Sequence, residues 1–406
     1  MNQSLTAAEK SLWSARIYYF LLGGAGGLLS PFINLFFNHQ GLNGTQIGLV
    51  NGLAAVVSMV TAPIWTRSSA NSSRPRLMLQ LTMLGSAVAV AALGFQSAFI
   101  WIAALMVVRS LVSSGTSPMS DALVLGVTGR TRAGFGSVRL FTSAGWAILA
   151  LLGGWLMGGM GLGVAFWGFA ALTLVSVGVL SGVAEGHPVV HFDDGINGGE
   201  KQSFRQVLAG LQHNRPMVGL AVMLAVLGFC MSGVTQFENI FISQLGGSTL
   251  MIGIVNTVGA MVEVPSMLLA DWWVRRSNAR QALMIGLMSY ISLRLVVFIF
   301  PSVGVIILSR ALGGLTFSFY TVGLMRYIAE NTSQREISTV LAIFSVTLPG
   351  LVNFIATPTA GLMFDLLGGR WLYLIGAAGY AIGWVCIWAS GPGRPKVKSG
   401  GAAAAN

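Results

Sequence analysis

Seven charged residues interrupt long apolar runs of the chain, and they are the residues best placed to do chemistry. A charge in apolar surroundings is costly unless it is paired or hydrated, so such residues usually face a polar interior and mark the route of an ion or a substrate. The alternative is an ion pair that only holds helices together. The seven residues are Arg109, Asp121, Arg139, Glu238, Glu263, Arg294 and Arg310.

Asp121 and Arg139 together could bind a polar solute. A carboxylate accepts hydrogen bonds and a guanidinium donates them in a planar fork, so the two groups can orient a polyol or a solute that carries a carboxylate. Trp146 follows Arg139 by about two helical turns on the same face, and its ring could stack on a sugar or an aromatic ring. We predict that these three residues bind the substrate. A salt bridge within the helix bundle is the alternative for the charged pair.

Glu263 is the best candidate for a proton carrier. A carboxyl group that moves between an apolar cavity and the neighbourhood of an arginine can bind a proton in one place and release it in the other. Arg294 is the predicted partner, and the alternative for Glu263 is a hydrogen bond to a neighbouring helix. Glu238 lies near one end of its apolar run and is predicted to be a gate or interface residue. Arg109 and Arg310 lie at similar depths and are predicted to have gating or structural roles.

The composition requires these charges to lie inside a membrane. The chain has 406 residues, of which 54% are hydrophobic and only 9% are charged, whereas a soluble protein has about 25% charged residues. Apolar runs of about 20 residues recur along the whole chain, which is the length that crosses a bilayer as a helix. The runs are continuous rather than alternating, which excludes a large β-barrel. We therefore predict an all-α membrane protein with spans at 14–37, 46–66, 77–96, 99–125, 136–158, 161–183, 217–241, 250–273, 281–300, 303–327, 337–363 and 371–390.

The longest polar stretch divides these spans into two sets of six. We predict an N-terminal six-helix bundle at 1–183, a cytoplasmic linker with a short interfacial helix at 184–216, a C-terminal six-helix bundle at 217–391 and a disordered tail at 392–406. A short internal repeat supports two pseudo-symmetric halves, because the second span begins with IGLVNG and the eighth with IGIVNT. Transporters of this architecture hold their substrate between the halves.

The basic residues fix the expected orientation. The formal net charge is +11. The basic residues lie between the spans rather than in one patch, so we interpret the charge as a topology signal and expect no nucleic acid partner. Nearly all loop lysines and arginines fall on one side of the predicted spans, and only Arg370 falls on the other. By the positive-inside rule, the basic side faces the cytoplasm. We therefore predict a protein of the cell (inner) membrane with both termini in the cytoplasm.

Catalytic, metal and nucleotide sites are not expected. No GxxxxGK[ST] motif is present, which argues against transport driven by ATP. The histidines all lie outside the predicted spans, so we expect no enzyme activity and no cofactor. The linker residues His187, His191, Asp193 and Asp194 have no spacing typical of a metal site and are interpreted as a solvated linker. Cys230 and Cys386 lie in apolar runs, which argues against a disulfide or a metal site.

Several segments together match the pattern of one family: Ser30 to Phe32, Gly41 to Gly48, Pro118, Asp121 and Ala122, Gly136 to Trp146, Glu263 to Pro265, and Arg294. The chain resembles the major facilitator superfamily, in the branch that holds lactose permease, nucleoside–proton symporters and phenylpropionate permease-like proteins. The resemblance covers nearly the whole chain and implies two six-helix bundles that work by alternating access. It implies that Asp121 and Arg139 match a pair that contacts sugar hydroxyls and that Glu263 matches a glutamate of the transport site.

The chain also departs from the family pattern. The loop after the second span reads Thr66-Arg67-Ser68-Ser69 and lacks the usual aspartate, whereas the copy after the eighth span keeps Asp271, which we predict to be a gating or structural residue. The positions of the lactose permease histidine and glutamate in the tenth span are Gly313 and Thr316 here. The proton mechanism of lactose permease therefore cannot be carried over whole.

These observations predict a secondary active transporter. It would move a small organic solute (a sugar, a nucleoside or an aromatic acid) by alternating access, in symport with protons. The alternatives are a proton-linked exporter of amphipathic compounds and a membrane sensor that transports nothing. The expected partners are the small-molecule substrate, protons and membrane lipid, and we expect a monomer.

Overall fold

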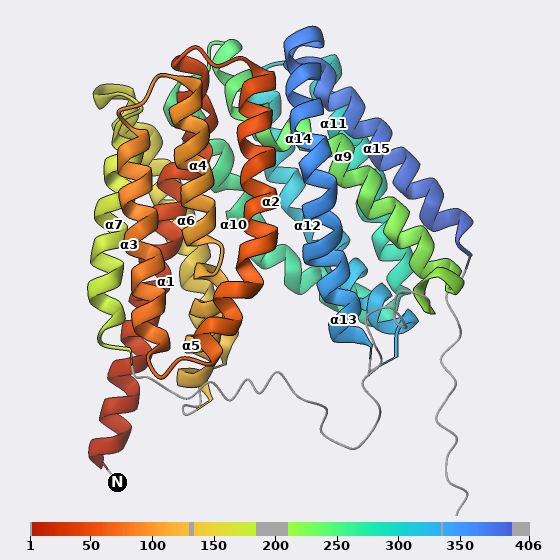
Figure 1. The fold of residues 1–406 in the computed structure, drawn as a ribbon. Helices are drawn as coiled ribbons and strands as arrows, with labels where there is room; N and C mark the ends of the chain where they lie inside the picture. The colour runs from red at the N-terminus through yellow and green to blue at the C-terminus, as the bar shows by residue number, and fades with distance from the viewer. Residues whose placement is uncertain (1, 130–133, 184–209, 334–335, 392–406) are drawn as a thin grey trace, which may run out of the picture.

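The fold is a bundle of long helices that form two halves (Figure 1). A computed structural model describes residues 2–129, 134–183, 210–333 and 336–391. The predicted tail and most of the predicted linker helix lie outside these residues. The first half contains α1 (Asn2–His39), α2 (Gly44–Ala70), α3 (Pro75–Leu93), α4 (Phe99–Ser113), α5 (Thr116–Thr128), α6 (Phe135–Met160) and α7 (Val164–Leu180). The second contains α9 (Arg215–Gln244), α10 (Thr249–Arg276), α11 (Ala279–Ile299), α12 (Val303–Asn331), α13 (Ile337–Ala342), the π-helical turn η1 (Ile343–Thr347), α14 (Leu348–Leu367) and α15 (Gly369–Ala389).

The prediction of an all-α protein with twelve spans is confirmed. Eleven helical segments among the described residues are long and apolar enough to cross a membrane, and the shorter α7 takes the place of the predicted sixth span. No strand occurs in the part of the chain that the structure describes. Large apolar side chains cover the outside of the bundle, for example Leu268 and Val88, as lipid-facing positions require.

Two spans are interrupted at positions where the sequence explains the break. The fourth span ends as α4 at Ser113 and resumes as α5 at Thr116, with Pro118 in the first turn. A β-carbon at Gly115 would lie 2.3 Å from the side chain of Trp65, so the close approach of α2 requires glycine there. The eleventh span contains η1 directly before Pro349, whose ring cannot follow an unbroken α-helix.

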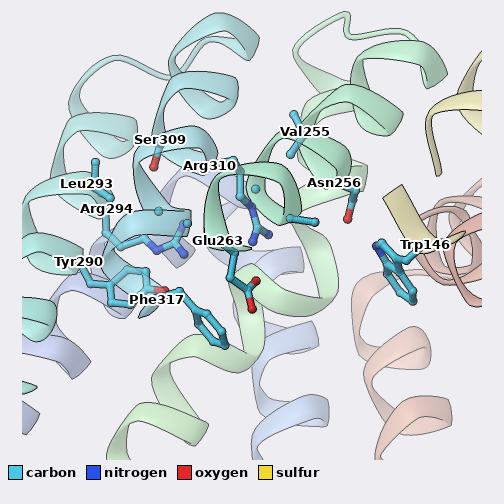
Figure 2. A pocket seen from close by; sticks show the side chains of 14 residues that line it. Trp146, Val255, Asn256, Glu263, Tyr290, Leu293, Arg294, Ser309, Arg310 and Phe317 are labelled. Atoms are coloured by element: carbon cyan, nitrogen blue, oxygen red, sulfur yellow. The ribbon is translucent and has the colours of Figure 1, made fainter. Parts of the chain in front are cut away.

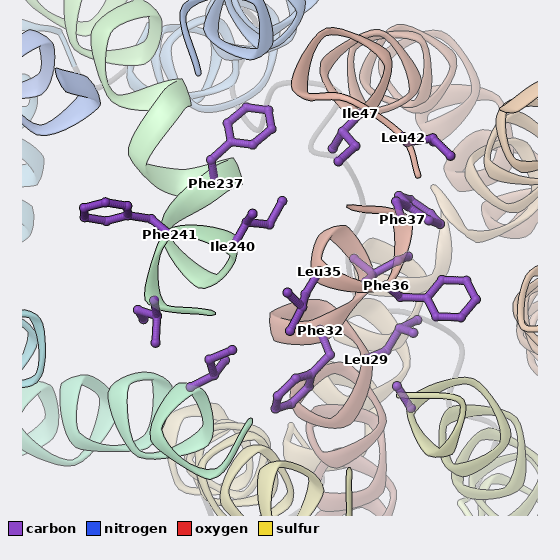
Figure 3. Packing of buried hydrophobic residues seen from close by; sticks show 14 of the residues in the cluster. Leu29, Phe32, Leu35, Phe36, Phe37, Leu42, Ile47, Phe237, Ile240 and Phe241 are labelled. Carbon is purple, nitrogen blue, oxygen red and sulfur yellow. The ribbon is translucent and has the colours of Figure 1, made fainter. Parts of the chain in front are cut away.

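The two halves share a core at one end only. One buried apolar cluster combines residues of both halves, and Figure 3 shows Phe32 and Leu35 of α1 opposite Phe237 and Ile240 of α9. At the other end, which carries the N-terminus, each half has a separate apolar cluster. We call these the shared end and the split end. Figure 1 shows α5 and α13 well apart at the split end.

Close backbone contacts seal the shared end. Glycines let α2 approach α14, because a β-carbon at Gly361 would lie 2.1 Å from the carbonyl oxygen of Gly44. The carboxylate of Asp365 then caps the start of α2: it accepts hydrogen bonds from the backbone N–H groups of Gly44 (2.6 Å) and Thr45 (2.7 Å). On the opposite flank α6 approaches α10, where Thr249 donates to the carbonyl of Gly154. Within the described residues, the halves are therefore joined chiefly by α1 with α9, α2 with α14, and α6 with α10.

Candidate functional site

A cavity of about 300 Å³ lies between the halves, beneath the shared end. The first half contributes Trp146 of α6. The second half contributes the remaining lining from α10, α11 and α12 (Figure 2). Because both halves line the site, movement of the halves against one another can open it to one side of the membrane or to the other. The lining residues used below are Trp146, Asn256, Glu263, Tyr290, Arg294, Arg310 and Phe317.

Glu263 stands in the wall of this cavity. It lies near the middle of α10, two residues before Pro265, and Figure 2 shows its carboxylate between Phe317 and Trp146. Among the described residues, the carboxylate makes no hydrogen bond or ion pair. The predicted pairing with Arg294 is therefore wrong for this conformation, because Arg294 is held by another acid.

That acid is Glu238 of α9, which lies at the centre of a buried ion network. Its side chain is 3% exposed and accepts a hydrogen bond from Arg310 Nε at 2.6 Å, with a second, shorter contact from Arg310 Nη2. Tyr373 donates its hydroxyl hydrogen at 2.8 Å, and Arg294 Nη1 lies 3.8 Å away. Two guanidinium groups and one hydroxyl thus compensate for the burial of a single carboxylate. Four helices, α9, α11, α12 and α15, are tied together at this point.

Aromatic rings complete the surroundings of Arg294. Its guanidinium carbon lies 5.9 Å from the ring centre of Tyr290 and 5.7 Å from that of Tyr373, and Tyr290 stacks on Tyr380 at 4.6 Å. The sequence reading missed Tyr290 and Tyr373. Tyr290 precedes Arg294 by four residues and so shares its helix face, which is a signal that could have found it.

The structure brings Asp121 and Arg139 together, as expected. Arg139 Nη1 lies 3.2 Å from Asp121 Oδ2, and Tyr19 donates its hydroxyl hydrogen to Asp121 Oδ1 at 2.6 Å. The pair is partly exposed toward the split end, with 59% of the Arg139 side chain and 32% of the Asp121 side chain accessible. Neither residue lines the cavity that contains Trp146. The three predicted substrate contacts are therefore divided between the Asp121–Arg139 pair and the cavity that Trp146 lines, and their role in binding stays a prediction.

Arg109 and Asp271, both predicted to be gating or structural residues, lie in different surroundings. Arg109 of α4 was expected to resemble Arg310, but among the described residues it has no acidic partner. Its Nε is buried without a hydrogen bond, and its guanidinium carbon lies 6.0 Å from the ring of Phe169. Asp271 is exposed near the end of α10.

A metal site is not found in the described part of the chain. No group of three or more histidine, cysteine, aspartate or glutamate side chains there could hold an ion. The histidines and aspartates of the linker lie outside the described residues. Cys230 and Cys386 are both free thiols.

Comparison with known proteins identifies the family. The MFS_1 like family matches residues 12–375. The chain belongs to this family of the major facilitator superfamily. A solved crystal structure of a mutant of the nucleoside transporter NupG superposes with a TM-score of 0.81 at 13% identity, covering 94% of this chain and all of that one. That likeness supports the fold, and the family makes the protein a multi-pass membrane transporter.

The names of several relatives of this MFS_1-like protein indicate that they transport different compounds. Maltose permease of Geobacillus stearothermophilus is 24% identical over 366 residues, which is 90% of this chain and 89% of the permease. The probable 3-phenylpropionic acid transporter of Escherichia coli K12 is 26% identical over 364 residues, covering 89% and 93% of the two chains. The multidrug resistance protein MdtG of Dickeya zeae is 26% identical over 264 residues, which is 63% of this chain and 62% of MdtG.

Proposed function

We propose that this transporter takes up a small polar organic solute together with a proton, and that the solute binds between Trp146 and Glu263. The observation that carries the proposal is the carboxylate of Glu263, which faces a cavity lined by both halves and has no partner among the described residues. An unpaired carboxylate that is partly shielded from water favours binding of a proton or of a solute that donates hydrogen bonds. The same group can therefore link the proton to the solute.

Alternating access supplies the pathway. We place the protein in the inner membrane with both termini in the cytoplasm. The split end then faces the cytoplasm, and the shared end faces the outside. The conformation is then inward-facing, with its outer side sealed by α1 against α9, α2 against α14 and α6 against α10. Asp121 and Arg139 lie on the inward side of the cavity, where we propose that they contact the solute on its route to the cytoplasm.

The solute class is a sugar, a nucleoside or an aromatic acid. Trp146 and Phe317 offer ring faces to a planar or pyranose ring, whereas Glu263 and Asn256 offer polar contacts. The named substrates of the relatives, maltose and 3-phenylpropionic acid, belong to these classes. A thermal-shift screen of the three classes on purified protein tests the proposal. A ligand of the site should stabilise the protein, and Trp146→Ala should remove that stabilisation. Equal stabilisation of the Trp146→Ala variant would place the ligand elsewhere.

Export is the second candidate, because the MdtG relative is named for multidrug resistance. The same fold can run an opposite coupling, in which protons enter as an amphipathic compound leaves. The direction of transport decides between the two. In right-side-out vesicles with an acidic exterior, a symporter accumulates its substrate inside, whereas an exporter depletes it.

A further inference from the structure

Four asparagines near the shared end repeat with the same spacing in both halves. Asn34 of α1 and Asn51 of α2 lie 17 residues apart, and so do Asn239 of α9 and Asn256 of α10. In each half, the amide of the second asparagine donates to the side-chain oxygen of the first. The distance is 3.0 Å from Asn51 to Asn34 and 3.4 Å from Asn256 to Asn239.

The first asparagine of each pair then reaches across to the other half. Asn34 Nδ2 donates to the backbone oxygen of Gln236 on α9 at 2.9 Å, and Asn239 Nδ2 donates to the backbone oxygen of Pro31 on α1 at 2.8 Å. Each acceptor lies three residues before the asparagine of its own helix. The two crossing bonds are therefore related by the pseudo-two-fold axis that relates the halves.

The side chain of Gln236 adds two further hydrogen bonds between the halves. The side-chain oxygen of Gln236 accepts hydrogen bonds from Asn34 at 3.0 Å and from Asn51 at 3.1 Å. The surroundings are apolar: Phe32 and Phe237 are fully buried in the core that both halves share. Amide groups in such a layer are stable only while they have partners, so parting the halves requires water to replace the crossing bonds.

The hydrogen-bonded asparagines lie next to the cavity, on the side of the shared end. Asn256 belongs both to the cavity lining and to the second asparagine pair. Its amide also donates to the backbone oxygen of Ile252 at 2.9 Å, which fixes its orientation. The polar layer is thus the first barrier that a solute in the cavity meets toward the shared end.

We propose that Asn34, Asn51, Asn239 and Asn256 form a symmetric amide clasp that is the outer gate of the transporter. The clasp is closed in this conformation and exchanges its crossing bonds for water when the shared end opens. The crossing bonds to the backbone oxygens of Gln236 and Pro31 are symmetry-related, and the Gln236 side chain adds two more on one side. This inference rests on the alternating-access step of the proposed function and on neither the substrate nor the coupled ion.

Thiol labelling from outside the cell tests the clasp. In a chain with Cys230→Ser and Cys386→Ser, a cavity cysteine at Ala260→Cys reports access to a membrane-impermeant maleimide. Asn239→Leu removes one crossing bond, so it should speed external labelling on the order of fivefold, the factor that corresponds to one net hydrogen bond. Asn34→Leu removes the bonds to both oxygens of Gln236, so its effect should be at least as large. Asn38→Leu is the matched control, because Asn38 donates to Leu42 within its own half and its loss should change nothing.

The outcomes separate the clasp from the proposed function, because the labelling needs neither substrate nor a proton gradient. Unchanged external labelling in both leucine variants would overturn the gate, and an effect in only one would overturn its symmetry, whatever the uptake assay shows. A second assay covers variants that label poorly because they misfold. Asn34→Cys with Gln236→Cys should be joined by a short bifunctional thiol reagent, and adding Asn239→Leu should lower the yield. An unchanged yield would contradict the clasp.

Discussion

Arg310 and Glu238 lie on different helices of the second half, and Arg310 Nε donates to Glu238 Oε2 over 2.6 Å in a site where only 3% of the glutamate side chain is exposed. A buried pair of this kind contributes little when intact but is costly to break from one side, because the remaining charge stays buried. Arg294 and Tyr373 share the same carboxylate, so losing its charge leaves two guanidinium groups without their counter-ion.

Glu238→Gln should therefore destabilise the fold. We expect the free energy of unfolding to fall by about 3–5 kcal/mol, as for other buried pairs broken from one side. Thermal unfolding followed by size-exclusion chromatography in detergent measures the change. Glu330→Gln is the control, because Glu330 pairs with Arg326 on a partly exposed helix face and an exposed pair four residues apart contributes about 0.3–0.5 kcal/mol. Equal unfolding temperatures for the two variants would contradict the network.

Asp121→Asn and Arg139→Gln should impair transport while leaving the stability of the fold almost unchanged. The pair is partly exposed, so its loss should change the free energy of unfolding by no more than about 1 kcal/mol. Uptake should nevertheless be abolished if the pair contacts the solute on its route. Parallel unfolding and uptake assays separate the two roles. Normal uptake by either variant would assign the pair a structural role only.

The helices could be predicted from the sequence because run length and loop polarity determine them. The α4–α5 break and η1 could not, since both depend on how a neighbouring helix or a proline acts on a span that is otherwise continuous in its apolar pattern. Asp121 and Arg139 were predicted to be close, and the structure confirms this. The partner of Arg294 was predicted wrongly, because helix spacing gives the depth of a charge but not the direction in which it points.

The contacts within the asparagine clasp could not be predicted from the sequence either. Asn51 and Asn256 occupy matching places in the repeat IGLVNG and IGIVNT, which the sequence shows directly. Their partners, 17 residues earlier in each half, also occupy matching places, in FINLF at 32–36 and FENIF at 237–241, but neither segment shows that the asparagines touch. Only the packing of α1 against α9 brings the four amides into one layer.

Orientation is tested by labelling at two exposed loop residues. Ser97, between α3 and α4, lies at the shared end, and Ser73, between α2 and α3, lies at the split end. A cysteine at Ser97 should react with an impermeant thiol reagent in intact cells, and one at Ser73 should react only after the membrane is opened. Reaction of Ser73→Cys in intact cells would invert the assigned topology.

Bulk at the α2–α14 contact should hold the outer side open. A side chain at position 361 would collide with the backbone of Gly44, and overpacking of this kind costs about 1–3 kcal/mol. Gly361→Leu should therefore increase external labelling of Ala260→Cys by roughly five- to hundredfold. Gly159→Leu is the control, since nothing lies within 4 Å of a β-carbon there. Identical labelling in the two variants would show that this contact does not seal the outer side.

Transport by Glu263→Gln tests the central claim most directly. Glutamine keeps the size of the side chain but cannot carry the proton, so the variant should lose accumulation of solute against its gradient. It should keep counterflow exchange in proteoliposomes, which needs no net proton movement. A differential stabilisation of about 1–3 kcal/mol between the two access states would account for the coupling. Loss of both activities would show that solute binding itself requires the carboxyl group of Glu263. A variant that still accumulates solute and still dissipates an imposed pH gradient would contradict the account, because the proton would then bind elsewhere.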